Sequence, residues 1–255
     1  MNKISVEKII ELKNISNITM ITAYDFVSGH IVNNSDAEII LVGDSLGTTT
    51  LGHEFTNRVK IEDIIRATQS ISRVGITKLM VSDMPFMTYE TKELALSNAL
   101  RLIDAGADAV KLEGGKEKTE IINFLVLNNI KVMGHIGIKP QSVDKISDYK
   151  ILGKNKIEEN NIFEDAKEVE SSGAFSVVLE LVDSKLSKNI TESISIPTIG
   201  ISSGKYTDGQ VQVYNDLIGY SPNKLPKHSK SFDNLFEKAQ SAINSFVEET
   251  KRKSK

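Results

Sequence analysis

The sequence predicts an α/β fold, a single-domain (β/α)8 (TIM) barrel over residues 1–255. Short apolar runs rich in β-branched residues alternate about eight times with stretches of helical periodicity, and this alternation produces a parallel sheet. The length of 255 residues suits such a barrel, which takes roughly 250. An open doubly wound sheet is the alternative, but no glycine-rich dinucleotide fingerprint follows the first run. We therefore favour the closed barrel.

The candidate strands are apolar runs that end in polar residues. Seven are clear, and the eighth is weaker because polar residues interrupt it. In chain order they cover residues 18–25, 38–45, 78–85, 109–115, 131–137, 176–182, 196–203 and 211–219.

The helices between these runs are predicted from periodicity and end signals. Apolar residues recur at helical spacing between Ile61 and Ile71. Thr91 is a suitable N-cap for a helix that ends at Ala105-Gly106, where glycine adopts the left-handed stop. An amphipathic stretch opens the chain. A C-terminal amphipathic helix is predicted from Phe232, Leu235, Phe236, Ala239, Ile243 and Phe246.

One supersecondary unit is used twice. The segments "AGADAVKLE" (105–113) and "SGAFSVVLE" (172–180) align without gaps, each with a glycine stop followed by a buried strand that finishes in glutamate. Glu113 and Glu180 should therefore occupy equivalent ends of two strands. The longest excursions, residues 46–60 and 138–160, follow strand ends and are candidate active-site loops.

Composition excludes several classes of function. The net charge of -3 gives no basic field for nucleic acid or an anionic membrane, and no apolar run approaches the roughly 20 residues of a spanning helix. The chain has no cysteine, which excludes disulfides, thiolate nucleophiles and Cys-ligated zinc. We expect a cytoplasmic enzyme that acts on small molecules, with no nucleic-acid or membrane partner.

Polar residues collect at the ends of the predicted strands, the rim where barrels of this kind place reactive groups. They are Tyr24, Asp25, Asp44, Ser45, Asp83, Lys111, Glu113, His135, Glu180, Ser202 and Ser203. Converging carboxylates raise one another's pKa unless a cation lies among them. Carboxylate oxygens without cysteine or clustered histidines suit Mg²⁺.

Each rim residue also has a structural interpretation. Asp44 could cap a helix or shape a turn, and Asp83 could end a strand. Lys111 and Glu113 could form a structural ion pair, and His135 could be a hydrogen-bonded core histidine. Together these interpretations are improbable, because so many buried polar residues would fall at one edge by chance.

Ordered sequence blocks resemble the ketopantoate hydroxymethyltransferase family. They are "ITAYD", "LVGDSLG", "SDMPFMTY", "AGADAVKLEGG", "VMGHIGIKPQS", "LELV" and "IPTIGISSG" followed by "DGQ", and they run from about residue 18 to about residue 230. The chain departs from the family pattern at Ser202-Ser203, Asn215 and Lys154. None of these is a predicted metal or base position.

The resemblance implies an activity with named participants. A hydroxymethyl group passes from 5,10-methylenetetrahydrofolate, the co-substrate, to 3-methyl-2-oxobutanoate through a Mg²⁺-stabilised enolate, giving ketopantoate in pantothenate and coenzyme A biosynthesis. A homo-oligomer, often a decamer, is also implied. Among the residues, the resemblance implies metal ligation by Asp44, Asp83 and Glu113, substrate binding by Asp44, Ser45, Asp83, Lys111 and His135, and catalysis by Glu180 as general base.

Two rivals remain at this point. Isocitrate lyase and phosphoenolpyruvate mutase relatives share the logic of barrel, metal and enolate, but the lyases use a loop cysteine that this chain lacks. A catalytically silent barrel used for binding would be favoured by loss of Asp44, Asp83, Lys111 or Glu180, and all four are present.

Overall fold

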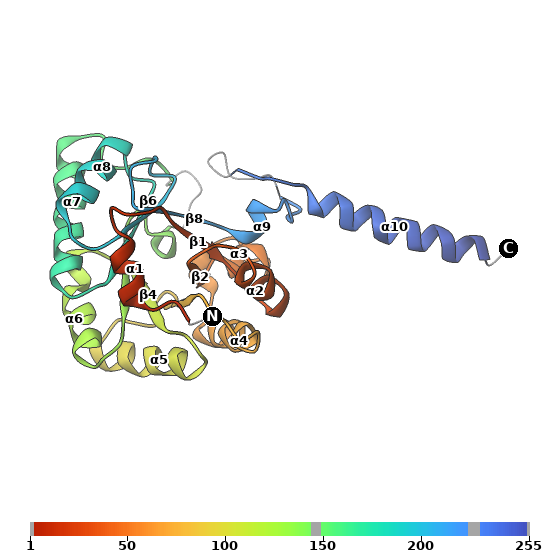
Figure 1. Cartoon of the computed structure of the whole chain (residues 1–255), viewed down its shortest axis with the longest axis horizontal. Helices are drawn as coiled ribbons and strands as arrows, with labels where there is room; N and C mark the ends of the chain where they lie inside the picture. Colours follow the sequence, from red (N-terminus) through yellow and green to blue (C-terminus); the bar gives the residue numbers. More distant parts are fainter. Residues whose placement is uncertain (1–2, 144–148, 224–229, 254–255) are drawn as a thin grey trace. The chain divides into compact units, whose positions relative to one another are not determined.

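A computed structural model describes residues 3–143, 149–223 and 230–253. Eight parallel strands close into a barrel in sequence order, which confirms the predicted fold (Figure 1). The strands are β1 (Ile18–Thr22), β2 (Ile39–Val42), β3 (Leu79–Asp83), β4 (Ala109–Glu113), β5 (Val132–Gly137), β6 (Ser176–Glu180), β7 (Thr198–Ile201) and β8 (Gly209–Gln212).

Helices follow most of the strands, and short 3-10 turns lie in the loops. The helices are α1 (Val6–Leu12), α2 (Phe26–Asn33), α3 (Leu46–Thr49), α4 (Ile61–Ser72), α5 (Lys92–Asp104), α6 (Thr119–Leu127), α7 (Lys156–Ser171), α8 (Ser184–Ser193), α9 (Tyr214–Leu217) and α10 (Leu235–Lys253). The turns are η1 (Thr56–Arg58), η2 (Lys116–Lys118) and η3 (Pro140–Ser142). Residues 202–208, between β7 and β8, form a loop without a helix.

The predicted end signals work as expected. The Thr91 hydroxyl accepts a hydrogen bond from Leu94 N at the start of α5. Gly106 and Gly173, the glycines of the repeated unit, both have positive φ, at 115° and 92°. The strands that follow them end at Glu113 and Glu180, so the two glutamates occupy equivalent positions.

The eighth strand differs from its prediction. It covers Gly209–Gln212 rather than residues 211–219, and Tyr214–Leu217 forms the short helix α9. The apolar run is divided between two elements, since Val211 is buried in the barrel and Asn215 and Asp216 lie in α9. Of the two predicted loops, 46–60 contains α3 and η1, and 138–160 contains η3 and the start of α7, with residues 144–148 outside the described part.

The barrel interior is layered because inward-facing side chains recur every second residue. The lower layer is apolar and belongs to one buried cluster, to which α1 adds Val6 and Ile9. Two residues further along each of several strands, the inward position becomes polar or glycine. The lower layer includes Leu41, Val81, Ala109, Met133 and Val178, and the positions above are Gly43, Asp83, Lys111, His135 and Glu180.

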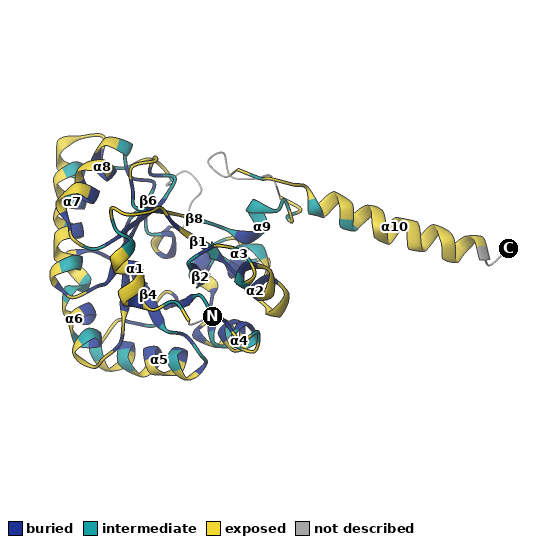
Figure 2. Cartoon of the chain, in the orientation of Figure 1, coloured by how far each residue is buried: buried dark blue, intermediate teal, exposed yellow. Residues whose placement is uncertain are grey.

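Contacts divide the chain into two compact units, one through Val211 and one from Gln212 onward. The organisation of residues 1–255 as one domain stays a prediction. Within the second unit, the predicted C-terminal helix is α10, although Phe232 lies before its first residue. Most large apolar side chains of α10 are exposed, including Ile243 at 60% and Phe246 at 70% (Figure 2). No described helix has the length and apolarity needed to cross a membrane.

Candidate active site

Asp44 and Ser45 leave the end of β2 at the start of a very short helix. Ser45, not Asp44, is the N-cap residue of α3, and its side chain makes no capping hydrogen bond. The Asp44 carboxylate is buried and has another task, since its Oδ2 accepts a hydrogen bond of 2.9 Å from Gln141 Nε2. Ser45 Oγ lies 2.8 Å from the hydroxyl of Tyr24. The interpretation of Asp44 as a helix cap is therefore wrong.

Strand register brings four of the predicted residues together. Asp83 of β3 pairs with Lys111 of β4, and Glu113 of β4 pairs with His135 of β5. Glu180 ends the neighbouring strand β6, opposite the last residue of β5. Because neighbouring parallel strands place paired residues side by side, the observed register gathers these polar side chains at one end of the barrel.

Lys111 is paired with Asp83. Its Nζ lies 2.9 Å from Asp83 Oδ1, and the two side chains are 5% and 2% exposed. Lys111 therefore forms its ion pair with Asp83 of the neighbouring strand rather than with Glu113, as the sequence had suggested. Two residues apart on one strand, Lys111 and Glu113 share a face, but the partner directly beside Lys111 is Asp83. Burial lowers the pKa of Lys111, yet Asp83, Asp44 and Glu113 outweigh it and raise the pKa above its usual range.

His135 lies between two glutamates. Its Nδ1 is 3.4 Å from Glu113 Oε1, and its Nε2 is 3.2 Å from Glu180 Oε2. Burial and the Lys111 ammonium lower the pKa of His135, but Glu113 and Glu180 outweigh them and raise it to about 9. The imidazole is thus a cation at neutral pH. It is more than a core histidine, because it links two of the predicted site carboxylates.

Two carboxylates at the rim are held in an unfavourable charged state. Burial and the nearby Glu113 raise the pKa of Asp44 to about 6, against the opposing effect of Lys111. Burial likewise raises the pKa of Asp83 to about 6 in spite of its ion pair. Four carboxylates, those of Asp44, Asp83, Glu113 and Glu180, face the two cations Lys111 and His135. A divalent cation would balance the two negative charges that remain.

The acidic side chains of this site suit Mg²⁺ bound through only one or two protein carboxylates. Among the described residues, no three His, Asp or Glu side chains converge as a ready-made metal cluster. Mg²⁺ is commonly held by one or two carboxylates, with water and substrate filling the other positions. Within the described residues, Asp83 Oδ1 accepts no hydrogen bond of good geometry, although Lys111 Nζ lies 2.9 Å away. This buried oxygen can therefore accept a further electrostatic partner.

Two contributors to this site were missed from the sequence, because Gln141 donates to Asp44 and Tyr89 donates to Gln141. Tyr24, which was expected at the rim, contacts Ser45. Gln141 and Tyr89 lie several residues beyond the ends of β5 and β3, so a search restricted to strand ends passes over them. The sequence signal that could have identified them is that Tyr89 and Gln141 lie in the blocks "SDMPFMTY" and "GHIGIKPQS", which carry the family resemblance.

Other polar residues near the strand ends have structural tasks. Asp25 accepts a hydrogen bond from Ser28 N and caps α2. Ser203 is buried and donates to the carbonyl oxygen of Leu179 at 2.7 Å, which ties the loop after β7 to β6. These contacts keep the rim in place without adding to the acidic cluster.

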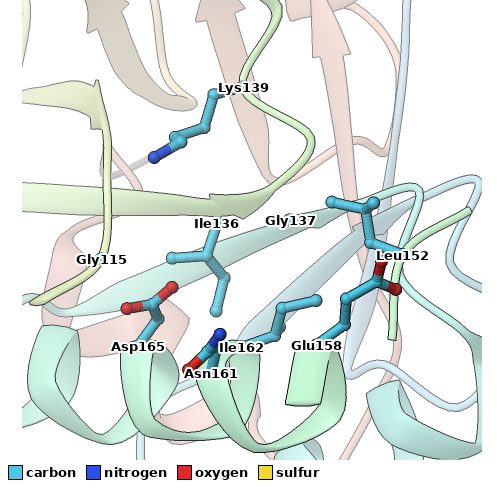
Figure 3. Close-up of a pocket in the computed structure, with 9 residues that line it drawn as sticks. All are labelled: Gly115, Ile136, Gly137, Lys139, Leu152, Glu158, Asn161, Ile162 and Asp165. Atoms are coloured by element: carbon cyan, nitrogen blue, oxygen red, sulfur yellow. The ribbon is translucent and has the colours of Figure 1, made fainter. Parts of the chain in front are cut away.

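A separate pocket of about 210 Å³ lies between the end of β5 and α7. Glu158, Asn161 and Asp165 project from α7 toward it (Figure 3). Asp165 accepts a hydrogen bond from Lys116 N, and burial raises its pKa. None of the predicted site residues lines this pocket, so it is distinct from the acidic cluster.

Comparisons with solved structures find other proteins with the same fold. A phosphonopyruvate hydrolase aligns with a TM-score of 0.65 at 9% identity, covering 100% of this chain and 88% of that one. An oxaloacetate acetylhydrolase in complex with 3,3-difluorooxalacetate aligns with a TM-score of 0.65 at 11% identity, covering 97% and 86%. At such low identity these similarities establish the fold alone.

Sequence comparisons are more specific. The family model described as ketopantoate hydroxymethyltransferase matches residues 3–254. The 3-methyl-2-oxobutanoate hydroxymethyltransferase of Thermotoga maritima is 43% identical, covering 97% of this chain and 92% of its own length. The enzyme of the same name from Clostridium botulinum strain Langeland is 48% identical, covering 94% and 89%. This chain therefore belongs to the ketopantoate hydroxymethyltransferase family, a family of transferase enzymes.

Proposed function

We propose that the chain transfers a hydroxymethyl group from 5,10-methylenetetrahydrofolate to 3-methyl-2-oxobutanoate, giving ketopantoate for pantothenate and coenzyme A biosynthesis. The observation that carries the proposal is the cluster of buried Asp83, Lys111, Glu113 and His135, with the largely buried Glu180, at the carboxyl ends of neighbouring strands. Opposite charges in one cluster suit an acceptor that carries both a carboxylate and a carbonyl. The names of the relatives from two organisms support the same acceptor.

The acidic residues would hold the ion. Asp44 and Asp83 would be the Mg²⁺ ligands, with Glu113 close by and connected through water. The bound ion would supply electrostatic stabilisation of the oxygen on which negative charge develops, an effect worth several kcal/mol. One structural neighbour, a phosphonopyruvate hydrolase, was solved in complex with oxalate and Mg²⁺, which is consistent with Mg²⁺ as the ion.

Lys111 and Ser45 would orient the acceptor. The Lys111 ammonium is protonated and buried, so it presents a compact positive charge to the substrate carboxylate. Ser45 would donate its hydroxyl to the same carboxylate, with Tyr24 OH holding that hydroxyl at 2.8 Å. Fixing the carboxylate sets the position of C3 relative to the base, and correct placement of reacting groups lowers the barrier.

Glu180 would act as the general base. Its carboxylate would take the C3 proton, and the electron pair left behind would make C3 the nucleophile that attacks the methylene carbon of the folate. One of the two carbon–nitrogen bonds of that carbon would break, and the released nitrogen would take up a proton. Hydrolysis of the remaining carbon–nitrogen bond then gives ketopantoate and tetrahydrofolate. A positioned base contributes about 10²–10⁴-fold to the rate. His135, at 3.2 Å from Glu180 Oε2, would orient this carboxylate.

The test separates metal, base and donor. Purified protein with both substrates should form ketopantoate, and chelation by EDTA should abolish it. In deuterated solvent, wild type with Mg²⁺ and 3-methyl-2-oxobutanoate alone should exchange the C3 proton. Glu180→Gln should still bind the keto acid but should not exchange that proton. Undiminished activity under EDTA would refute the metal role, and wild-type exchange by Glu180→Gln would remove Glu180 as base.

The assembly and location remain predictions of the same proposal. Small-molecule substrates, a cytoplasmic location and a homo-oligomer, up to a decamer, follow from family resemblance. Sedimentation analysis of the purified chain tests the oligomer directly.

A further inference from the structure

Gln141 connects two of the proposed metal-binding carboxylates. It lies in η3 after β5, and the residue is only 1% exposed. Its side-chain Nε2 donates to Asp44 Oδ2 at 2.9 Å and to the carbonyl oxygen of Met84 at 3.0 Å. Its backbone N donates to Glu113 Oε2 at 3.1 Å. A single residue thus holds carboxylates that come from the ends of two different strands.

Tyr89 fixes which way the Gln141 amide faces. The Tyr89 hydroxyl donates to Gln141 Oε1 at 2.6 Å, and both residues are buried. With Oε1 directed at Tyr89, the NH₂ group faces Asp44 and Met84 O. A reversed amide would bring Oε1 against the Asp44 carboxylate and leave the Met84 carbonyl without this donor, and both changes are unfavourable in a buried site. All three contacts of the amide therefore require one orientation.

Tyr89 is itself supported from the next loop. The Lys118 ammonium lies 5.0 Å from the centre of the Tyr89 ring and 3.2 Å from Glu90 Oε1. A cation over an aromatic face is attracted by the ring electrons. Lys118 thus contacts the Tyr89 ring, the Tyr89 hydroxyl binds the Gln141 side-chain amide, and that amide binds Asp44.

We propose that Gln141, oriented by Tyr89, is a positioning residue that holds Asp44 and Glu113 in the arrangement that accepts the divalent cation. The inference rests on the proposed function, because it concerns the same metal. The alternative is that Gln141 merely ties the loop after β5 to the barrel. In that case its loss would lower the stability of the fold but leave the affinity for metal unchanged.

The test measures metal binding directly. Three variants, Gln141→Met, Tyr89→Phe and the double substitution, are titrated with Mn²⁺ by water-proton relaxation, without either substrate. Loss of groups that orient metal ligands typically costs about 10–100-fold in affinity, and we expect that range for each single variant. Because Tyr89 acts through Gln141, the double variant should bind Mn²⁺ as Gln141→Met does.

A control separates positioning from stability. Thr191→Val removes a buried hydroxyl that donates to Ser187 O at 2.8 Å and lies 2.8 Å from Thr198 Oγ1, away from the acidic cluster. It should lower the melting temperature without weakening Mn²⁺ binding. At saturating Mn²⁺, C3 proton exchange by Tyr89→Phe should return toward the wild-type rate, which places the defect in metal affinity rather than in the chemical step.

Each outcome decides the question. Mn²⁺ affinities of both single variants within about twofold of wild type, a change of roughly 0.4 kcal/mol, would overturn the inference while leaving the proposed function intact. Additive losses in the double variant would also overturn it. A wild type that binds no Mn²⁺ would overturn the proposed metal role and this inference with it. Should Gln141→Met fail to fold, Tyr89→Phe, which removes one oxygen atom, decides alone.

Discussion

Replacing Lys111 with methionine tests whether burial, rather than distance, determines the strength of an ion pair in this chain. Lys111 Nζ lies 2.9 Å from Asp83 Oδ1, with both side chains at most 5% exposed. Removing one partner of a buried pair leaves a charge without compensation, which costs about 3–5 kcal/mol. A domain is stabilised by only about 5–15 kcal/mol, so the loss should be large.

The chain offers a matched control, an ion pair with a shorter N···O distance but more exposed side chains. Lys3 Nζ lies 2.6 Å from Asp108 Oδ1, but the two side chains are 41% and 27% exposed. Exposed pairs contribute about 0–1 kcal/mol, so Lys3→Met should change the free energy of unfolding little. Distance alone would predict the opposite ranking.

Urea denaturation followed by far-UV circular dichroism measures both variants, since the chain has no tryptophan for fluorescence. The deficit of Lys111→Met should shrink as the pH falls from about 7 to about 5, because Lys111 lowers the pKa of Asp83 and its loss lets Asp83 take up a proton while folded. Equal losses in Lys3→Met and Lys111→Met, or a deficit that does not change with pH, would refute the reasoning.

Three further outcomes are expected. In the metal-free protein, the His135 imidazole should titrate near pH 9 when followed by NMR. Because its pKa in the folded state lies above the unfolded value of about 6.5, the stability that it contributes should be lost as the pH rises through about 9. A midpoint near 6.5 would contradict this. Gly137→Ala should destabilise the protein by more than about 2 kcal/mol in thermal unfolding, because φ is 93° and a Cβ would lie 2.3 Å from Glu180 O. Gly75→Ala, with φ of 77° but open space around the new methyl group, should cost only the backbone strain of about 1–2 kcal/mol.

Most of the barrel was predictable because the signals that specify it are local. The strands from β1 to β7 fall within their predicted runs, and Gly106 and Gly173 end their helices as expected. The weak eighth run could not be resolved locally. Its division into β8 and α9 depends on which of its residues the closed barrel buries, and that is decided by the rest of the molecule.

The site was predictable to the extent that it lies at strand ends. Asp83, Lys111, His135 and Glu180 occupy inward positions at those ends, so periodicity and register bring them together. The partner of Lys111 was misjudged, because spacing along one strand does not show which neighbouring side chain is closer. Gln141 escaped notice for a similar reason, since a loop residue reaches the acids only through tertiary folding.

The bond between Lys13 and Asp208 has a consequence for how the chain reaches its native state. Lys13 Nζ lies 2.8 Å from Asp208 Oδ2, and Ile18 N donates to the Asp208 carbonyl, joining the beginning of the chain to its last strand connection. Lys13 and Asp208 are separated by 195 residues of sequence, and contacts between such distant segments form slowly. During synthesis, one edge of β1 therefore stays unpaired until β8 has left the ribosome.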